Sequence, residues 1–477
     1  MKILYVTSEA NPFAASGGLG DVLGALPIAA HQKGADTEVI LPLYSSMKEE
    51  HRSELEFVGD ISFRLSWRNT GASIYKITRS GVNYYFVENH YYFDRVKLYG
   101  EYDDGERFAF FSMAVIEFMR QMKNVPNVLH ANDWQTALSV IYLKTLYSHD
   151  RELSKIRTVY TVHNIEYQGK YDPYILGDVF SLDKSYYSIV EYDGCINLTK
   201  GALVSADFVT TVSPNYAYEL RHDFFAFGLA KIIDGISDKM CGVINGIDYT
   251  YFSPSVGNEL YKNYTVRTRK SGKAANKTSL RRDLALEDNP DIPLIVMITR
   301  LAGGKGIDLV LHIADELLDE KIQLVVLGTG EPEYEAAFRD LEARHNKNMR
   351  ALIKFDRTLS KKMYAAADIF LMPSKSEPCG LAQMIACRYG TLPVVHGVGG
   401  LKDTIIPYGE KNANGFVFEN FNAHELLFTI KHALAIKNDN ADDWTMLVKQ
   451  AMKTDFSWDA SAQKNLDLYA TIIGEKQ

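Results

Sequence analysis

Short runs of apolar and β-branched residues alternate with amphipathic stretches along this chain of 477 residues. In the first half the runs lie at 3–6, 37–41, 127–130, 158–162 and 208–212. Such short, continuous runs are typical of strands that are buried on both faces of a parallel sheet. The segment 60–88 instead places aromatic and β-branched residues at alternating positions, which predicts an antiparallel extension of the same sheet.

A second series of apolar runs follows after a gap, at 294–298, 324–327, 351–355, 369–372 and 392–395. The gap, from Asn245 to about Lys277, is rich in polar and turn-forming residues and is predicted to be a loop-rich connection. Strands that alternate with amphipathic helices predict the α/β class. We therefore expect two doubly wound domains joined in this zone.

Composition and charge narrow the class of function. The chain has 46% hydrophobic and 23% charged residues, and its formal charge of -8 comes from scattered acids without a Lys/Arg block. This argues against a nucleic acid or a membrane as a partner and favours a small anionic ligand. No secretion signal or membrane span is recognisable, so we expect a cytoplasmic protein with buried structural thiols. The cysteines are Cys195, Cys241, Cys379 and Cys387.

A glycine loop follows the first predicted strand and precedes a predicted helix. Gly17 and Gly18, between Ser16 and Asp21, would let backbone N–H groups approach a ligand at the start of that helix. A phosphate or a sugar fits such a place. The alternative is a tight structural turn, because the spacing is neither that of a P-loop nor that of a dinucleotide-binding loop.

Two polar clusters follow later strands of the first series. Asp133 comes after the run 127–130 and could accept hydroxyl hydrogen bonds from a sugar, and His163 comes after 158–162 and could donate one. Because parallel strands end at the same edge of a sheet, both are expected at one site. For each histidine alone, a hydrogen-bonded core residue is the alternative.

Cations and an acid follow the strands of the second series. Arg300 and Lys305 come after the run 294–298 in a glycine-containing segment that suits a pyrophosphate, with two surface cations as the alternative. Glu377 comes after 369–372, just before a predicted helix start, and could accept hydrogen bonds from two sugar hydroxyls. Its alternative role is helix capping. Together these residues favour a sugar nucleotide as ligand.

From end to end the chain resembles bacterial glycogen synthases and plant starch synthases. The resemblance rests on Gly17-Gly18-Leu19 with Asp21, His130-Ala131-Asn132-Asp133-Trp134, Thr161-Val162-His163-Asn164, Asn245-Gly246-Ile247-Asp248, Arg300 with Lys305, Ser376-Glu377-Pro378-Cys379-Gly380-Leu381, and Gly399-Gly400-Leu401-Lys402-Asp403-Thr404. It implies the GT-B fold, two Rossmann-like domains facing across a deep cleft. The domains would be 1–245 on the acceptor side and 246–456 on the donor side, with 457–477 as a last helix crossing back.

The resemblance also implies an activity and its residues. The activity is transfer of glucose, with retention, from ADP-glucose to the non-reducing end of an α-1,4-glucan, without cofactor or metal. Arg300 and Lys305 would neutralise the phosphates, Glu377 would hold the glucose hydroxyls, and His163 and Asp133 would lie at the reacting sugar. The donor-binding positions would be Ser16, Gly17, Gly18, Asp21, Asn245, Phe355 stacked on the base, Cys379, Gly380 and Leu381. The pair Asp103-Asp104 is interpreted as a solvated acidic turn instead of a metal site.

One position departs from the family pattern, in which a lysine precedes the glycine loop by two residues. Here that position is Ala15, so a charge-assisted contact of roughly 1.5–3 kcal/mol with the donor is expected to be missing. Two alternatives stay open, and Ala15 is an argument for the second of them only. One is another GT-B glucosyltransferase with a small acceptor, and the other is a catalytically impaired homologue that only binds glucan or nucleotide.

Overall fold

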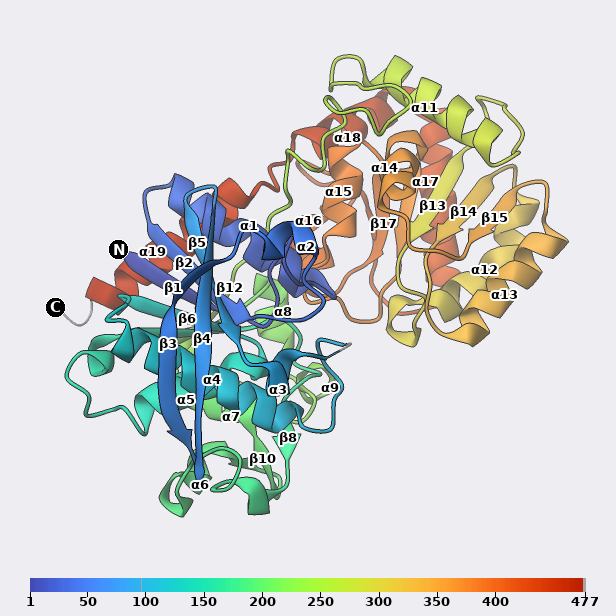
Figure 1. Ribbon diagram of the computed structural model, residues 1–477. Coiled ribbons are helices and arrows are strands. Elements are labelled where there is room, and N and C mark those ends of the chain that lie inside the picture. Colours follow the sequence, from blue (N-terminus) through green and yellow to red (C-terminus); the bar gives the residue numbers. More distant parts are fainter. Residues whose placement is uncertain (96, 475–477) are drawn as a thin grey trace. The chain divides into compact units, whose positions relative to one another are not determined.

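The computed structural model describes residues 1–95 and 97–474, which divide into two compact units (Figure 1). Unit 1 contains Met1–Gly246 together with the residues from Trp458 onward, and unit 2 contains Ile247–Ser457. The chain therefore leaves unit 1 once, forms all of unit 2, and returns. In the described ranges no helix is long and apolar enough to cross a bilayer.

Unit 1 is built on one nine-stranded sheet of order β12-β11-β7-β6-β1-β2-β5-β4-β3. Its strands are β1 (Lys2–Val6), β2 (Asp36–Pro42), β3 (Glu56–Leu65), β4 (Arg68–Arg79), β5 (Val82–Glu88), β6 (Val128–Asn132), β7 (Arg157–Val162), β11 (Phe208–Thr211) and β12 (Met240–Gly242). The β3–β4 and β4–β5 pairs are antiparallel and all other pairs are parallel. The predicted buried strands and the antiparallel extension are thus confirmed.

Helices cover this sheet, and a small second sheet lies in the same unit. The helices are α1 (Gly18–Gln32), α2 (Glu49–Arg52), α3 (His90–Phe93), α4 (Asp104–Gln121), α5 (Ala137–Lys144), α6 (Tyr187–Val190), α7 (Leu198–Ser205), α8 (Pro214–Glu219), α9 (Asp223–Ala226), α10 (Ala230–Asp234) and α19 (Trp458–Gly474), and the second sheet joins β8 (Lys170–Tyr171), β10 (Cys195–Asn197) and β9 (Glu191–Tyr192). The parallel strand order reverses at β1, which lies between β2 and β6. In doubly wound sheets ligands bind beyond the carboxyl ends of the strands at this reversal.

Helix α19 is joined to the sheet by a buried hydrogen-bond chain. The Tyr469 hydroxyl lies 2.6 Å from His130 Nδ1, and His130 Nε2 bonds to the Thr161 hydroxyl. All three side chains are buried. Burial and the nearby His163 lower the pKa of His130 to about 3, so the imidazole is neutral at pH 7. Each ring nitrogen therefore needs one partner in the dry interior.

Tyr469→Phe is expected to destabilise unit 1 by about 1–3 kcal/mol, because it leaves His130 Nδ1 buried without a partner. Urea unfolding followed by fluorescence would show this as a lower midpoint of the unit 1 transition. The matched control is Tyr218→Phe, at a tyrosine whose side chain is largely exposed. Equal unfolding midpoints for the two variants would contradict the buried hydrogen-bond chain from Tyr469 through His130 to Thr161.

Unit 2 has a fully parallel six-stranded sheet of order β15-β14-β13-β16-β17-β18. Its strands are β13 (Leu294–Ile298), β14 (Gln323–Leu327), β15 (Met349–Leu352), β16 (Ile369–Met372), β17 (Leu392–His396) and β18 (Phe416–Phe418), and its helices are α11 (Arg269–Asp283), α12 (Ile307–Asp319), α13 (Pro332–Arg344), α14 (Arg357–Ala366), α15 (Ala382–Arg388), α16 (Gly399–Thr404), α17 (Ala423–Asp439) and α18 (Ala441–Lys453). The strand order reverses between β13 and β16. Both units are therefore doubly wound α/β domains, as predicted.

Two predictions for unit 2 need correction. The third strand ends at Leu352, not at Phe355, because Leu352 is the last residue to pair with β14 and Asp356 already caps α14. The predicted loop to Lys277 is also wrong, because α11 begins at Arg269. This helix is strongly polar and carries few apolar residues, so its sequence lacks the apolar periodicity that marks a buried helix.

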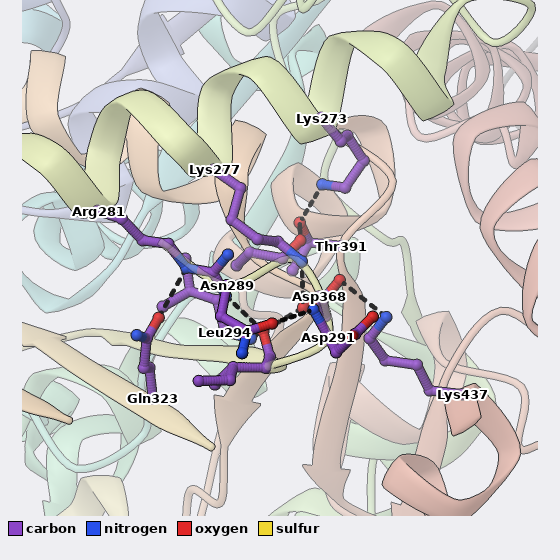
Figure 2. Close-up of polar contacts among 12 residues, drawn as sticks. Lys273, Lys277, Arg281, Asn289, Asp291, Leu294, Gln323, Asp368, Thr391 and Lys437 are labelled. Atoms are coloured by element: carbon purple, nitrogen blue, oxygen red, sulfur yellow. Dashed lines mark hydrogen bonds and ion pairs between the residues drawn. The ribbon is translucent and has the colours of Figure 1, made fainter. Parts of the chain in front are cut away.

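Three cations of α11 lie on the face that packs against the sheet (Figure 2). Lys273, Lys277 and Arg281 are spaced four residues apart, so they share one side of the helix. Lys277 Nζ lies 2.5 Å from the carboxylate of Asp368, which precedes β16. The same carboxylate accepts the N–H of Leu294 at 2.8 Å. An ion pair therefore joins the helix to the starts of the two central strands.

The remaining cations of this cluster contact neutral groups, the same acid or, for Arg281, also Asp288 at 3.8 Å. Lys273 Nζ donates to the Thr391 hydroxyl at 2.9 Å, and Arg281 Nε donates to Gln323 Oε1 at 2.8 Å. Lys437, from α17, lies 3.5 Å from Asp368. Two lysines thus pair with one aspartate, and Figure 2 shows Lys277 and Lys437 reaching it from two different helices.

Two further sequence interpretations change with the structure. Asp104 is not part of a solvated acidic turn: it begins α4 and pairs at 2.5 Å with the fully buried Arg107, while Asp103 pairs with Arg95 at 2.8 Å. In the described ranges no group of three or more His, Cys, Asp or Glu residues could hold a metal ion. Within the described residues the four cysteines form no disulfide, and only Cys379 and Cys387 are buried.

Candidate active site

A cavity of about 220 Å³ opens in unit 2 beyond the carboxyl ends of β13 and β16, where the strand order reverses. It is lined by Met297, Ile298, Thr299, Arg300, Lys305, Leu371, Met372, Ser374, Glu377, Leu381 and Ala382. The structure therefore brings together three of the charged residues proposed from the sequence. The apolar ends of β13 and β16 form part of the cavity wall, as expected for a site that binds a small ligand.

Lys305 and Glu377 form an ion pair at this cavity. Lys305 Nζ lies 2.6 Å from Glu377 Oε2, with side-chain exposures of 22% and 12%. The same oxygen accepts the Ser374 hydroxyl at 3.1 Å. The acid is therefore held in one orientation by a cation and a hydroxyl, while its second oxygen stays available for the hydroxyls of a ligand.

Glycines allow the segment 373–381 to approach its neighbours closely. A Cβ on Gly306, which has φ +67°, would lie 2.0 Å from the Pro373 carbonyl oxygen. On the other side, a Cβ on Gly399, at φ +44°, would lie 2.0 Å from the carbonyl oxygen of Glu377. The Gly400 N–H donates to that same oxygen at 3.0 Å. Both flanks of the segment thus exclude any larger residue.

Gly399→Ala is expected to lower activity at least tenfold, because the added methyl group would displace the backbone of Glu377. Initial rates of the glucosyl transfer that the resemblance implies, together with a thermal unfolding curve, would separate displacement from unfolding. The matched control is Gly409→Ala, which also has positive φ but has open space around its Cβ position. A Gly399→Ala variant as active as Gly409→Ala would contradict the close packing.

Other predicted residues of unit 2 lie around the cavity or away from it. Arg300 follows β13 and is exposed at the cavity lining. Leu381 immediately precedes α15, while Gln383 donates to the carbonyl oxygens of Cys379 and Gly380 at 3.1 and 3.0 Å. Phe355 is 79% exposed and does not line this cavity. It follows the edge strand β15, two strands away from β13.

In unit 1, the glycine loop is organised by an acid that the sequence analysis missed. Glu9 follows β1 and accepts the Ser16 N–H at 2.5 Å, the Ser16 hydroxyl at 2.7 Å and the Gly17 N–H at 3.2 Å. Tyr99 also donates to it at 2.6 Å. Two N–H groups expected to face a ligand therefore face Glu9. Open space remains over Gly18, where α1 begins.

Asp133 and His163 lie together beyond β6 and β7, as expected. Asp133, at φ +57°, accepts the His163 N–H at 2.7 Å, so its carboxylate fixes the backbone after the neighbouring strand. Burial raises the pKa of Asp133 to about 7, although the N–H groups of His163 and Asn164 oppose the shift. A group with such a pKa takes up a proton near neutral pH.

The tautomer of His163 follows from its partner. Asn132 Nδ2 donates to the carbonyl oxygens of Val6 and His130 at 3.1 Å, so Asn132 Oδ1 is the atom that faces His163 Nε2 at 2.9 Å. Nε2 therefore carries the proton and Nδ1 the lone pair. Burial lowers the pKa of His163 to about 3, so the ring is neutral at pH 7.

The last two predicted residues of unit 1 lie at different places. Asp21, in the first turn of α1, is exposed and accepts a hydrogen bond from Asn11. Asn245 is half-buried, beyond β12 and next to the point where the chain enters unit 2. Asn132 could have been predicted, since it ends β6 directly before the proposed site residue Asp133.

Comparison with known proteins supports this picture over the whole length. Residues 2–235 match the family model of the starch synthase catalytic domain, and residues 277–447 match that of group 1 glycosyl transferases. A glycogen synthase of Clostridium beijerinckii is 44% identical over 480 residues, covering 100% of both chains. One from Geobacillus thermodenitrificans is 41% identical and covers 100% of this chain and 99% of its own.

Solved structures agree with the sequence relatives. The catalytic domain of starch synthase IV from Arabidopsis thaliana, bound to ADP and acarbose, matches with a TM-score of 0.90 and 32% identity over 99% of each chain. Sucrose-phosphate synthase from Thermosynechococcus elongatus, at 16% identity and a TM-score of 0.64, shares the fold over 99% of each chain. The chain therefore belongs to the family of bacterial glycogen synthases and plant starch synthases, which are glycosyltransferases of the GT-B fold.

Proposed function

We propose that this glycosyltransferase transfers glucose from ADP-glucose to the non-reducing end of an α-1,4-glucan with retention of configuration. The observation that carries the proposal is the Lys305–Glu377 pair, which lies with Arg300 at one cavity beyond β13 and β16. Two cations beside a hydrogen-bonding acid suit a sugar diphosphate, with the phosphates on the cations and the sugar on the acid. The adenine base is favoured by the ADP bound to the related starch synthase IV.

The proposed mechanism follows from which groups are charged. As the bond between glucose and phosphate breaks, negative charge grows on the leaving diphosphate, and Arg300 and Lys305 stabilise it. The acceptor hydroxyl attacks from the same face and passes its proton to the leaving phosphate oxygen. Glu377 holds the glucose hydroxyls, and no step requires a metal ion or a cofactor. We also propose that the protein acts in the cytoplasm.

We assign the acceptor and the reacting sugar to the carboxyl edge of unit 1. His163 offers its Nδ1 lone pair to a sugar hydroxyl, and Asp133 positions the backbone of His163. The donor would be contacted from this unit by Ser16, Gly17, Gly18, Asp21 and Asn245, and from unit 2 by Phe355, Cys379, Gly380 and Leu381.

We further propose that the chain bends at the segments 245–255 and 455–460 when the donor binds. Solution scattering profiles unchanged by donor and acceptor would contradict the bending.

The test is nucleotide release from ADP-glucose or UDP-glucose, each with and without glycogen. We expect glycogen-dependent release of ADP, and the formation of an iodine-staining glucan excludes a small acceptor. Release of UDP alone would contradict the proposed donor. Release that does not depend on glycogen would contradict the proposed acceptor.

Ala15 favours one other candidate, a homologue that binds glucan or nucleotide without turnover. Its side chain is exposed, so a longer one can be accommodated. We expect Ala15→Lys to lower the KM for ADP-glucose by about tenfold, because a new cation meets the phosphates. Ala15→Met is the matched uncharged control. If neither the native chain nor Ala15→Lys released nucleotide, the protein would instead be a homologue that binds glucan or nucleotide without turnover.

A further inference from the structure

His396, at the end of β17, bridges two backbone carbonyl groups in unit 2. Its Nδ1 lies 2.9 Å from the carbonyl oxygen of Ser374, and its Nε2 lies 3.2 Å from that of Glu419. The ring is buried, stacked on Phe418 at 5.2 Å and packed beside Phe421 at 5.5 Å. The aromatic neighbours leave the imidazole little freedom to turn away from the two oxygens.

Both partners of His396 can only accept hydrogen bonds. A neutral imidazole carries a single N–H, so it can satisfy one of the two carbonyl oxygens and must present a lone pair to the other. Only the imidazolium form donates to both. The bridge between Ser374 and Glu419 is therefore complete only when His396 carries a positive charge.

The Ser374 end of this bridge leads directly to the ion pair of the candidate active site. The Ser374 hydroxyl donates to Glu377 Oε2 at 3.1 Å, and that oxygen pairs with Lys305 at 2.6 Å. The next residue, Lys375, donates its N–H to the carbonyl oxygen of Gly304 at 3.0 Å. A shift of the Ser374 backbone would therefore move Glu377 relative to Lys305.

Charged groups from each neighbouring element surround the bridge. The carboxylate of Glu419 lies near residue 397, since a Cβ on Gly397 would be 3.2 Å from its Oε2, and Lys402 of α16 lies 4.0 Å from the same oxygen. Glu425 of α17 accepts the Glu419 N–H at 3.0 Å. On the segment 373–381, the charged groups are Lys375 and Glu377. Charged groups of both signs thus lie on the segments that flank the ring.

We propose that His396 is a positioning residue that holds Ser374, and through it Glu377, only while its imidazole is protonated. The catalytic consequence rests on the proposed function, whereas the charge state of the ring does not. At a pH where the imidazolium loses a proton, one carbonyl contact is lost and the Glu377–Lys305 pair loosens. The value of kcat/KM for the donor should then fall, while unit 2 stays folded.

The first test is ¹⁵N magnetic resonance of the histidine ring nitrogens in the full chain, assigned with His396→Gln. We expect both nitrogens of His396 to be protonated at pH 7. A ring with one unprotonated nitrogen at pH 7 would overturn the proposal. This readout is independent of turnover, so it still decides the charge state if the native chain releases no nucleotide and the proposed function fails.

The second test compares pH profiles of kcat/KM for ADP-glucose in the native chain, His396→Arg and His396→Gln. We expect the native value to fall about tenfold as the pH rises and the imidazolium is lost. Arginine stays charged at every pH and should remove this fall, whereas glutamine should give a low, flat profile. The control is His432→Gln, at an exposed histidine of α17, which should keep the native profile. A native fall that persists in His396→Gln would overturn the proposal.

Discussion

Lys305→Ala is expected to lower kcat/KM for glucosyl transfer by about a thousandfold. Lys305 contributes one of the two cations that would meet the leaving diphosphate, and removing one preorganised charge-stabilising group costs about 10²–10³ in rate. The change also leaves Glu377, whose side chain is 12% exposed, without its cation at 2.6 Å. Initial rates of ADP release at saturating glycogen would measure the loss.

Two variants isolate the role of this ion pair. Lys431→Ala removes an exposed lysine of the same unit that pairs with Glu316 and Glu320, and it should leave the rate unchanged. Glu377→Gln keeps the size of the acid but removes its charge, and it should also lose at least a hundredfold. Near-native turnover in Lys305→Ala or Glu377→Gln would contradict the mechanism, provided that the thermal unfolding curves agree.

Asp368→Asn is expected to destabilise unit 2 by about 3–5 kcal/mol, because it leaves the buried Lys277 and the half-buried Lys437 without their counter-ion. Asparagine can still accept a hydrogen bond from the Leu294 N–H, so the lost free energy of unfolding comes mainly from the missing negative charge. Urea unfolding of unit 2 would measure it, and Asp315→Asn, at an exposed acid paired with Arg344, is the control with an effect below about 1 kcal/mol. The double variant Lys277→Met with Asp368→Asn should recover part of the loss. An equally unstable double variant would contradict the pairing.

The same pair predicts how stability depends on pH. Burial alone raises the pKa of Asp368, but the charges of Lys277 and Lys437 outweigh it, and with hydrogen bonds from Lys277 and Leu294 they lower the pKa to about 2. A carboxyl whose pKa is depressed in the folded state stabilises the fold above its unfolded pKa of about 4. This contribution, about 2 kcal/mol, is lost as the pH falls from 4 to 2. Asp368→Asn should lack that acid-dependent component.

The sequence predicted the two sheets well because buried parallel strands need continuous apolar runs, and both series contain them. It failed for α11, whose buried face holds Lys277 and Arg281 and a single buried aliphatic residue, Leu280. Such a face is stable only because Asp368 and Gln323 lie opposite it. No local pattern reveals partners that lie tens of residues away in the chain. The strand end at Leu352 was missed because apolar residues continue past the last pairing.

The candidate site was predictable where a motif follows a strand, as for Arg300, Lys305 and Glu377. Their pairing was not, because the distance between Lys305 and Glu377 depends on contacts of Gly306 and Gly399 with other loops. Glu9 carried no motif of its own and was recognised only from its four hydrogen bonds in the fold. Phe355 was placed by resemblance alone, and it lies outside the unit 2 cavity.

Unit 2 is inserted within unit 1, since α19 returns to the sheet that Met1–Gly246 began. During synthesis on the ribosome, unit 2 is therefore complete before unit 1 has received the residues that contain Tyr469. Until then His130 lacks its hydroxyl partner, and the face of α1 that packs on α19 is uncovered. A nascent unit 1 must wait until α19 has been synthesised, so a ribosome that pauses within unit 2 would leave it open to aggregation or proteolysis.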